Sequence, residues 1–150
     1  MFVDMNRQAQ GDLGEASARC WYAFAGHDIY LPTGHSPDAD FIADSGDHLI
    51  RVQVKTCGHI RQGNWQVAVC TRGGNRSWSG VAKYFCATRC DELFVVIIDG
   101  RRWRIPADKV EARTTVSLGG RKYAEYEVDP GPPLGAVQAP SSLPSPAPAG

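Results

Sequence analysis

Four polar residues in one short stretch have the types and spacing that phosphate-ester chemistry needs. Asp38 and Asp40 precede a short apolar run, and Gln53 and Lys55 lie two residues apart in a second run. Carboxylate and amide oxygens bind Mg²⁺ or Mn²⁺, and a lysine ammonium can neutralise charge on a phosphate. An acid, an amide and a lysine on one surface would therefore support metal-dependent hydrolysis of a phosphodiester.

The two apolar runs, residues 41–43 and 49–54, predict a β-hairpin that would bring these groups together. The residues between them are small and acidic, which favours a tight reversal at Ser45, Gly46 and Asp47. Side chains of a strand alternate between its faces, so the second run has an apolar and a polar face. These faces comprise Ile50, Val52 and Val54, and Arg51, Gln53 and Lys55, respectively. Because glutamine and lysine are rarely buried unless paired, the polar face is either solvated or the floor of a polar site.

Two aspartates compete for the role of principal acid. Asp38 would share a strand face with Asp40 if the strand began early. Pro37 and the apolar pair that follows Asp40 instead indicate that the strand begins near Asp40. We therefore favour Asp40.

Residues 6–25 carry the clearest helical signal, and Gly26 is well placed to end the helix. A stripe at helical spacing predicts its buried face, with two further residues beside it. The stripe comprises Leu13, Ser17, Cys20 and Phe24, flanked by Ala16 and Trp21.

Two glycines and a glutamate within this helix need a separate explanation. Gly11 and Gly14 each cost a helix about 1 kcal/mol relative to alanine, which indicates close approach of another backbone or a ligand. Glu15 lies nearly opposite the predicted stripe, beside Arg19. Periodicity alone therefore predicts that Glu15 forms a solvated i,i+4 ion pair.

The remaining pattern predicts a layered domain of α/β or α+β class. Strands are expected at residues 28–31, 65–70, 93–99, 102–106 and, at a sheet edge, 121–128, with a short helix at 107–112. From Asp129 onward proline, glycine, alanine and serine predominate, so we expect a folded domain at 1–128 and a disordered tail at 129–150.

Charge and cysteine content bound the function. The net charge is zero, but residues 1–50 carry eight acidic and two basic groups, and residues 51–104 carry three acidic and ten basic groups. This asymmetry fits a metal site beside a phosphate-binding surface, or chance segregation on a solvated exterior. We expect Arg51, Arg72, Arg76 and Lys83 to contact nucleic acid, although the loop that holds Arg72 and Arg76 could equally be a mobile polar loop.

The five cysteines form no C-x-x-C pair, and no apolar run is long enough to span a membrane. The N-terminus also lacks the layout of a signal peptide. We therefore expect a cytoplasmic protein with reduced thiols and no membrane partner.

The spacing around these residues resembles the PD-(D/E)-x-K nucleases, here as Pro37-Asp38-x-Asp40 with Gln53-Val54-Lys55. Most of that superfamily has an acid where this chain has Gln53, and the branch associated with group I introns uses Gln-x-Lys. The segments that match that branch are Gly11-Asp12-Leu13-Gly14-Glu15, Tyr30-Leu31-Pro32 and Arg51-Val52-Gln53-Val54-Lys55-Thr56.

The resemblance implies a restriction-endonuclease-like α/β core, with a mixed β-sheet flanked by helices. It implies a metal-dependent endonuclease that hydrolyses DNA, with Glu15 pointing into the site and not at solvent. Asp40, Gln53 and Glu15 would hold Mg²⁺ or Mn²⁺, aided by the Val54 carbonyl, and Lys55 would act on the phosphate and the attacking water. Duplex DNA and a homo-oligomer, a dimer or tetramer, are the implied partners.

Other functions remain open at this stage. A non-catalytic nucleic-acid-binding module would keep the basic segment without a metal site, and the same fold also serves junction, repair and defence nucleases. In an interaction protein, Gln53 and Lys55 would be solvated strand residues. A Ser/His or Cys/His hydrolase is disfavoured because the four histidines are scattered and no Gly-x-Ser-x-Gly motif occurs.

Overall fold

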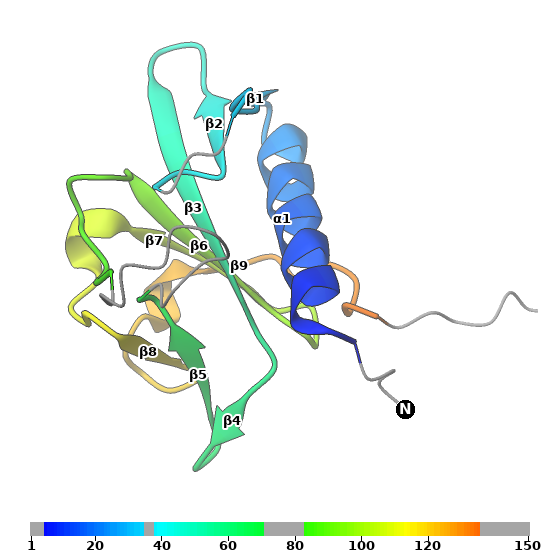
Figure 1. The fold of residues 1–150 in the computed structure, drawn as a ribbon, viewed down its shortest axis with the longest axis vertical. Coiled ribbons are helices and arrows are strands. Elements are labelled where there is room, and N and C mark those ends of the chain that lie inside the picture. Colours follow the sequence, from blue (N-terminus) through cyan, green and yellow to red (C-terminus); the bar gives the residue numbers. More distant parts are fainter. Residues whose placement is uncertain (1–4, 35–37, 71–82, 136–150) are drawn as a thin grey trace, which may run out of the picture.

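The computed structural model describes residues 5–34, 38–70 and 83–135. Its centre is a six-stranded mixed sheet of strand order β1-β2-β3-β6-β7-β9, in which β3 and β6 are parallel and the other pairs antiparallel (Figure 1). The strands are β1 (Asp28–Tyr30), β2 (Phe41–Asp44), β3 (Leu49–Cys57), β6 (Glu92–Ile97), β7 (Arg102–Pro106) and β9 (Glu127–Val128). The long strand β3 is thus the junction between an antiparallel hairpin and a parallel pair.

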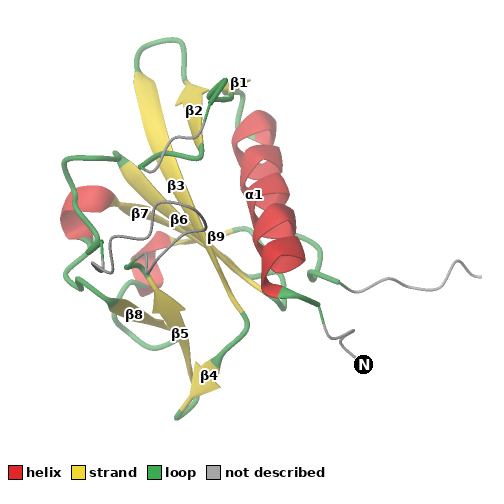
Figure 2. Cartoon of the chain, in the orientation of Figure 1, coloured by secondary structure: helices red, strands yellow, loops and turns green. Residues whose placement is uncertain are grey.

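One face of this sheet is covered by a single α-helix, α1 (Arg7–Phe24), whose N-terminus is capped by the Asn6 side chain (Figure 2). The core beneath α1 is built from Ala18, Tyr22, Phe41, Ala43, Ile50, Val52, Val54, Phe94, Val96 and Leu134. Burial of these apolar side chains fixes the helix across β2, β3 and β6.

The buried face of α1 differs from the predicted stripe. Leu13 and Phe24 are 41% and 89% exposed, whereas Gly14, Ser17, Ala18 and Tyr22 are the buried residues. The reason is steric. A Cβ atom on Gly14 would lie 1.8 Å from Thr56 Oγ1 on β3, so the missing side chain lets the helix approach the sheet along this line.

The opposite face of the central sheet is covered by a second sheet of order β4-β5-β8, where the sequence predicted flanking helices. Its strands are β4 (Ile60–Arg61), β5 (Asn64–Ala68) and β8 (Thr115–Leu118), of which the sequence predicted only β5. Val67, Val116 and Leu118 pack inward onto Leu93, Val95, Ile97, Trp103 and Ile105. Apart from its one α-helix, the described chain contains two short 3₁₀ turns, Ala107–Lys109 and Ala124–Tyr126, in place of the predicted helix at 107–112 and most of the predicted strand at 121–128.

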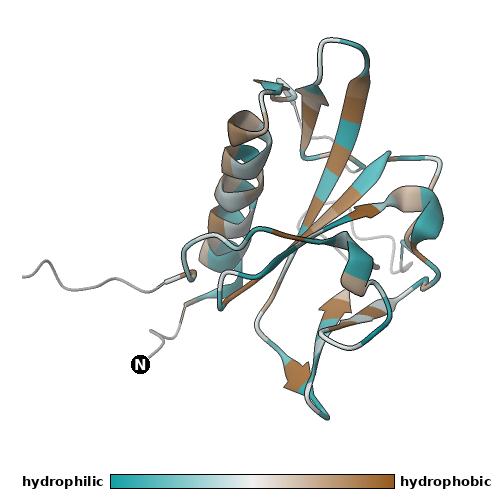
Figure 3. Ribbon diagram, turned by 180° about the vertical axis from the view of Figure 1, so that it is seen from behind, coloured by the Kyte–Doolittle hydropathy of each residue, from teal (hydrophilic) through white to brown (hydrophobic). Residues whose placement is uncertain are grey.

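The predicted hairpin is confirmed. β2 and β3 pair antiparallel around residues 45–48, with Phe41 opposite Val52 and Asp44 opposite Leu49. Ile50, Val52 and Val54 are buried under α1, and Gln53 and Lys55 lie on the other face. The alternation is visible along β3 in Figure 3.

The fold extends beyond the predicted boundary at residue 128. Leu134 is only 6% exposed, and its N–H donates to the Ile98 carbonyl at 2.9 Å. The Gly131 N–H likewise donates to the Gly100 carbonyl at 2.8 Å. Disorder from residue 129 is therefore wrong for residues 129–135, because one buried leucine and two main-chain hydrogen bonds hold this segment; residues 136–150 lie outside the described part.

The structure also bears on the state of the cysteines and on membrane-spanning helices. All five cysteines are free thiols. Within the described residues, no helix has the length and apolar character needed to cross a membrane.

Candidate active site

Asp40 lies where the β2–β3 ladder ends. Its N–H donates to the Val52 carbonyl at 2.8 Å, and its carboxylate Oδ2 accepts the Val54 N–H at 2.6 Å. These two bonds bracket Gln53, so Asp40 lies opposite Gln53 one step beyond the last strand pair. The main-chain bonds hold the carboxylate against the edge of β3, where Asp40 is half-buried.

Beyond the last β2–β3 pair, the backbone groups on the β2 edge of β3 face the Asp40 carboxylate, beginning with Val54. Alternate residues of a strand direct their backbone groups to opposite edges. The Arg51 and Cys57 carbonyls accept bonds from Asp91 and Ile98 on the β6 side. The Val54 carbonyl must then point the other way, to the same edge as the Val54 N–H and Asp40.

Glu15 reaches the same place from α1. The close contact of Gly14 with Thr56 brings the next residue of the helix over the end of the hairpin. Burial raises the pKa of Glu15, and the neighbouring negative charge of Asp40 raises it further. Arg19, one turn on, contacts Glu15 at 3.6 Å and opposes that effect. The two carboxyl groups therefore interact, and they form what we call the acidic pair.

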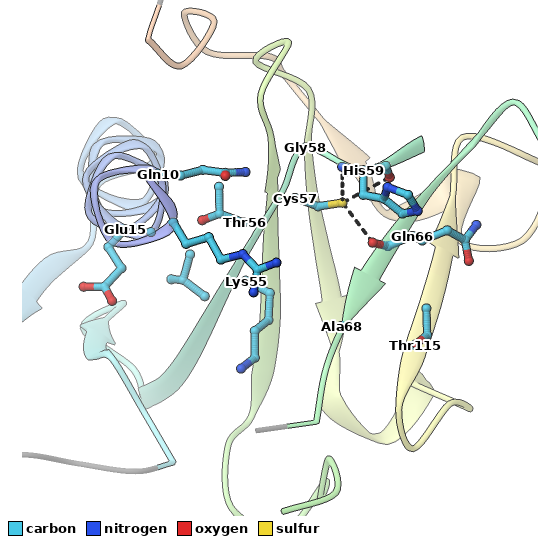
Figure 4. Close-up of a pocket in the computed structure, with 13 residues that line it drawn as sticks. Gln10, Glu15, Lys55, Thr56, Cys57, Gly58, His59, Gln66, Ala68 and Thr115 are labelled. Carbon is cyan, nitrogen blue, oxygen red and sulfur yellow. Dashed lines mark hydrogen bonds between the residues drawn. The ribbon is translucent and has the colours of Figure 1, made fainter. Parts of the chain in front are cut away.

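Electrostatics also connect Lys55 to the acidic pair. Burial raises the pKa of Asp40, while the Val54 N–H and the positive charge of Lys55 lower it. Lys55 and Glu15 line one open cavity of about 730 Å³ between α1, β3 and β5 (Figure 4). The fold thus brings together three of the four predicted site residues, although they are far apart in sequence.

Gln53, the fourth, borders a different hollow. Its neighbours there include Asp38 and Lys83. Asp38 is held by ion pairs to Lys83 at 2.6 Å and Arg89 at 3.6 Å. The acid that competed with Asp40 in the sequence is thereby tied to two cations, which supports the preference for Asp40.

Two of the four residues predicted to contact nucleic acid form ion pairs with acidic side chains. Arg51 forms a two-pronged ion pair with Asp91, both N···O distances being 3.1 Å, and Lys83 pairs with Asp38. Arg72 and Arg76 lie outside the described residues. A sequence pattern could not locate the partners of Arg51 and Lys83, which are 40 and 45 residues away.

The cavity includes residues that the sequence did not single out. Gln10 of α1 lies on one side of the cavity and Gln66 of β5 on the other (Figure 4). Arg7 of α1 also lines the cavity. The buried Cys57 thiol of β3 donates a hydrogen bond to the Gln66 carbonyl at 2.9 Å and so connects β3 to β5. The alternation of β5 was the available signal for Gln66, since its even-numbered residues face away from the apolar ones.

Comparison with known proteins identifies this arrangement. The sequence model of the PD-(D/E)XK endonuclease family matches residues 5–117, most of the chain and all of the acidic pair and Lys55. The chain belongs to this family. It is therefore a nuclease of the PD-(D/E)XK type, as the spacing of its polar residues indicated.

A solved structure has a similar fold over most of the chain. It is the structure of a bacterial homing endonuclease, I-Ssp6803I, with a TM-score of 0.69 and 19% sequence identity; the match covers 82% of this chain and 89% of that chain. At this identity the likeness concerns the fold, and it confirms the restriction-endonuclease-like core. The search of curated proteins gave no match.

PD-(D/E)XK nucleases generally use divalent metals, and the donors present here fit such an ion. No group of three or more His, Cys, Asp or Glu that could hold a metal occurs within residues 5–34, 38–70 and 83–135. Mg²⁺, however, typically takes only one or two protein carboxylates and keeps several waters. Glu15 and Asp40 provide two carboxylates, and a cation would relieve the burial and repulsion that raise their pKa values.

Proposed function

We propose that this chain is a Mg²⁺- or Mn²⁺-dependent endodeoxyribonuclease that hydrolyses duplex DNA. The proposal rests mainly on the acidic pair of Glu15 and Asp40 beside Lys55 at the open edge of β3. Two interacting carboxyl groups with raised pKa values next to a lysine are typical of a functional site, and Glu15 and Lys55 line an open cavity. Membership of the PD-(D/E)XK family supports phosphodiester hydrolysis by that site.

Each residue has a role that follows from its position. Asp40 would be the principal metal ligand because main-chain bonds fix its carboxylate, and Glu15 would be the second acid. The Val54 carbonyl, turned to the same edge, would add a neutral oxygen. A bound divalent ion would polarise the phosphodiester and lower the pKa of an attacking water.

Lys55 would act on the substrate side of the acidic pair. Its ammonium lies on the polar face of β3 and lines the cavity that contains Glu15. From there it would neutralise charge on the scissile phosphate and orient the attacking water. Gln53, which borders the neighbouring hollow with Asp38, would contribute a ligand only after its side chain turns toward Asp40.

We also propose that the active form is a homo-oligomer of two or four copies. One acidic pair can cut one strand at a time, so double-strand cleavage requires two sites. The smallest assembly that meets this need is a dimer.

The test is cleavage of supercoiled plasmid by the purified protein with Mg²⁺, Mn²⁺ or EDTA, beside Lys55→Ala and Lys109→Ala. Lys109 is an exposed lysine of a 3₁₀ turn and does not line the cavity, so its variant is a matched control. We expect metal-dependent nicking or linearisation by the wild type and Lys109→Ala, and none by Lys55→Ala. Equal cleavage by Lys55→Ala would refute the assignment, because it would reveal a contaminant or another site.

Because plasmid cleavage requires that the plasmid contain the preferred site, metal titration by calorimetry accompanies the cleavage assay. Asp40→Ala is expected to abolish Mn²⁺ binding while the protein stays folded. DNA affinity without any metal binding by the wild type would instead indicate a non-catalytic nucleic-acid-binding module.

A further inference from the structure

The small sheet β4-β5-β8 has an outer face with no covering layer among the described residues. Its inward residues are apolar and buried, and those that alternate with them are half-buried or exposed. This outer face comprises Gln66 and Ala68 of β5 and Thr115 and Ser117 of β8. Its side chains are either small or polar and able to form hydrogen bonds. The outer face is therefore suited to binding a polar ligand through hydrogen bonds.

The outer face continues into the candidate active site. Gln66, Ala68 and Thr115 line the same cavity as Glu15 and Lys55 (Figure 4). The thiol of Cys57, two residues after Lys55, donates to the Gln66 carbonyl, and the Gln66 N–H donates to the His59 carbonyl at 2.9 Å. These bonds fix the position of β5 relative to Lys55. A ligand bound on the outer face would therefore have a fixed position relative to the acidic pair.

The amide of Gln66 is held in position across the strand pair. Gln66 lies directly opposite Ser117, and its Nε2 donates to Ser117 Oγ at 3.0 Å. Gln66 Nε2 also donates to the Asn64 carbonyl at 3.4 Å. When its Nε2 turns away from these two protein acceptors, glutamine can pair with an adenine edge through both amide atoms, and serine or threonine hydroxyls bond to any base. The major groove of DNA, about 12 Å wide, admits a two-stranded β-ribbon. The β5–β8 pair offers such a ribbon with its polar side outward.

Two positively charged side chains line this cavity, Arg7 of α1 and Lys55 of β3. Among the described residues, Arg7 and Lys55 have no ion-pair partner, whereas Arg51 and Lys83 are paired with acids. Arg7 lies on the α1 side of the cavity, opposite the outer face. A duplex whose scissile phosphate reached Lys55 would meet Arg7 on one side and the β5–β8 ribbon on the other.

We infer that the outer face of β5 and β8 reads base edges in the DNA major groove, with Gln66 and Ser117 as specificity-determining residues and Arg7 as a phosphate contact. This inference rests on the proposed function, since it identifies how that same site selects its duplex. It assigns sequence reading to the small sheet, which carries none of the metal ligands.

The experiment is a binding selection from a duplex DNA library with a randomised central segment, in EDTA and in Ca²⁺, followed by sequencing. It compares the wild type with Gln66→Ala, Ser117→Ala, Arg7→Ala and the control Gln8→Ala. Gln8 is an exposed glutamine of α1 that does not line the cavity. Thermal melting of each variant accompanies the selection, and the Ser117 variant keeps the test valid if Gln66→Ala does not fold.

We expect the wild type and Gln8→Ala to enrich the same motif. Gln66→Ala should lose roughly 5- to 150-fold of base discrimination at one or two adjacent positions of that motif. Arg7→Ala should weaken all sequences alike and reduce the slope of log affinity against log salt by about 1.

Unchanged base preference in both Gln66→Ala and Ser117→Ala would overturn the inference, as would a wild type that binds DNA without any preference. A wild type that binds no DNA would overturn the inference and the proposed function together. A wild type that selects a motif through Gln66 but does not cleave it with Mg²⁺ would refute the nuclease activity alone.

Discussion

Substituting Gly14 by alanine perturbs the close approach of α1 to β3 at Thr56. The added Cβ would lie 1.8 Å from Thr56 Oγ1, 2.9 Å from its Cβ and 3.0 Å from its Cγ2. The hydroxyl can rotate, but the Thr56 Cβ is fixed by the strand. Since carbon atoms pack at roughly 3.5–4.0 Å, the helix must withdraw by roughly 0.5–1 Å.

Gly11→Ala is the matched control on the same helix. Its Cβ would meet nothing within 4 Å, so only helix propensity changes. We expect Gly11→Ala to stabilise the protein by about 1 kcal/mol. Gly14→Ala gains the same propensity but adds an overpacking cost of about 1–3 kcal/mol, for a net loss of about 0–2 kcal/mol. The two variants should therefore differ by about 1–3 kcal/mol in urea unfolding.

The shift should also move Glu15 away from Asp40. Mn²⁺ titration should show weaker binding by Gly14→Ala and unchanged binding by Gly11→Ala. Cleavage should fall by as much as about 100-fold for a displacement near 1 Å. Adding Thr56→Ala, which removes the Oγ1 and Cγ2 atoms, should restore part of both losses. Equal stability and equal Mn²⁺ affinity of the two alanine variants would refute the reasoning, because the Gly14–Thr56 contact would then not position the site.

Three further substitutions test the electrostatics and the packing. The pKa of Glu15 is raised in the fold, so the stabilisation from its protonated form is present below the ordinary glutamate pKa and is lost as pH rises through the folded pKa. In EDTA, Glu15→Gln should therefore have a higher melting temperature than the wild type near pH 8. The difference in melting temperature should shrink toward pH 4. Leu134→Ala should lower the free energy of unfolding in urea by about 2–5 kcal/mol, because Leu134 is buried. The control Leu31→Ala, at a leucine that is 60% exposed, should lower it by less than about 0.5 kcal/mol. Similar losses in the two variants would contradict the packing of residues 129–135. Glu92→Gln leaves the part-buried Arg104 guanidinium without its two-pronged carboxylate partner, so a loss near 3 kcal/mol is expected by the same assay, and no loss would show that Arg104 finds another partner.

The local part of the site was predictable from the sequence. The hairpin follows from two apolar runs around a Ser-Gly-Asp reversal, and the polar face of β3 follows from strict alternation. Neither inference needs knowledge of distant residues. The choice of Asp40 over Asp38 also came from local signals, and the ion pairs of Asp38 agree with it.

The parts that failed depend on contacts between distant segments. The hydropathy of α1 pointed to Leu13 and Phe24, but the face is chosen by Gly14 against Thr56 and by the Tyr22 hydroxyl, which donates to Glu92 70 residues away. Tyr22 carries a polar atom that must find a partner when buried, so its burial depends on Glu92 and the attached Arg104. No periodicity within the helix contains that information.

Asp40 shows how the candidate site and the fold are linked. A strand pair must end somewhere, and the edge it leaves open has backbone groups that need partners. Here the Asp40 carboxylate accepts the Val54 N–H just past the last pair, so one side chain both closes the ladder and remains on the exposed edge beside Glu15 and Lys55. The geometry that satisfies the backbone also fixes the carboxylate without relying on a mobile loop. Precise placement of an acid at this edge therefore follows from the start of β2 at Phe41, one residue after Asp40.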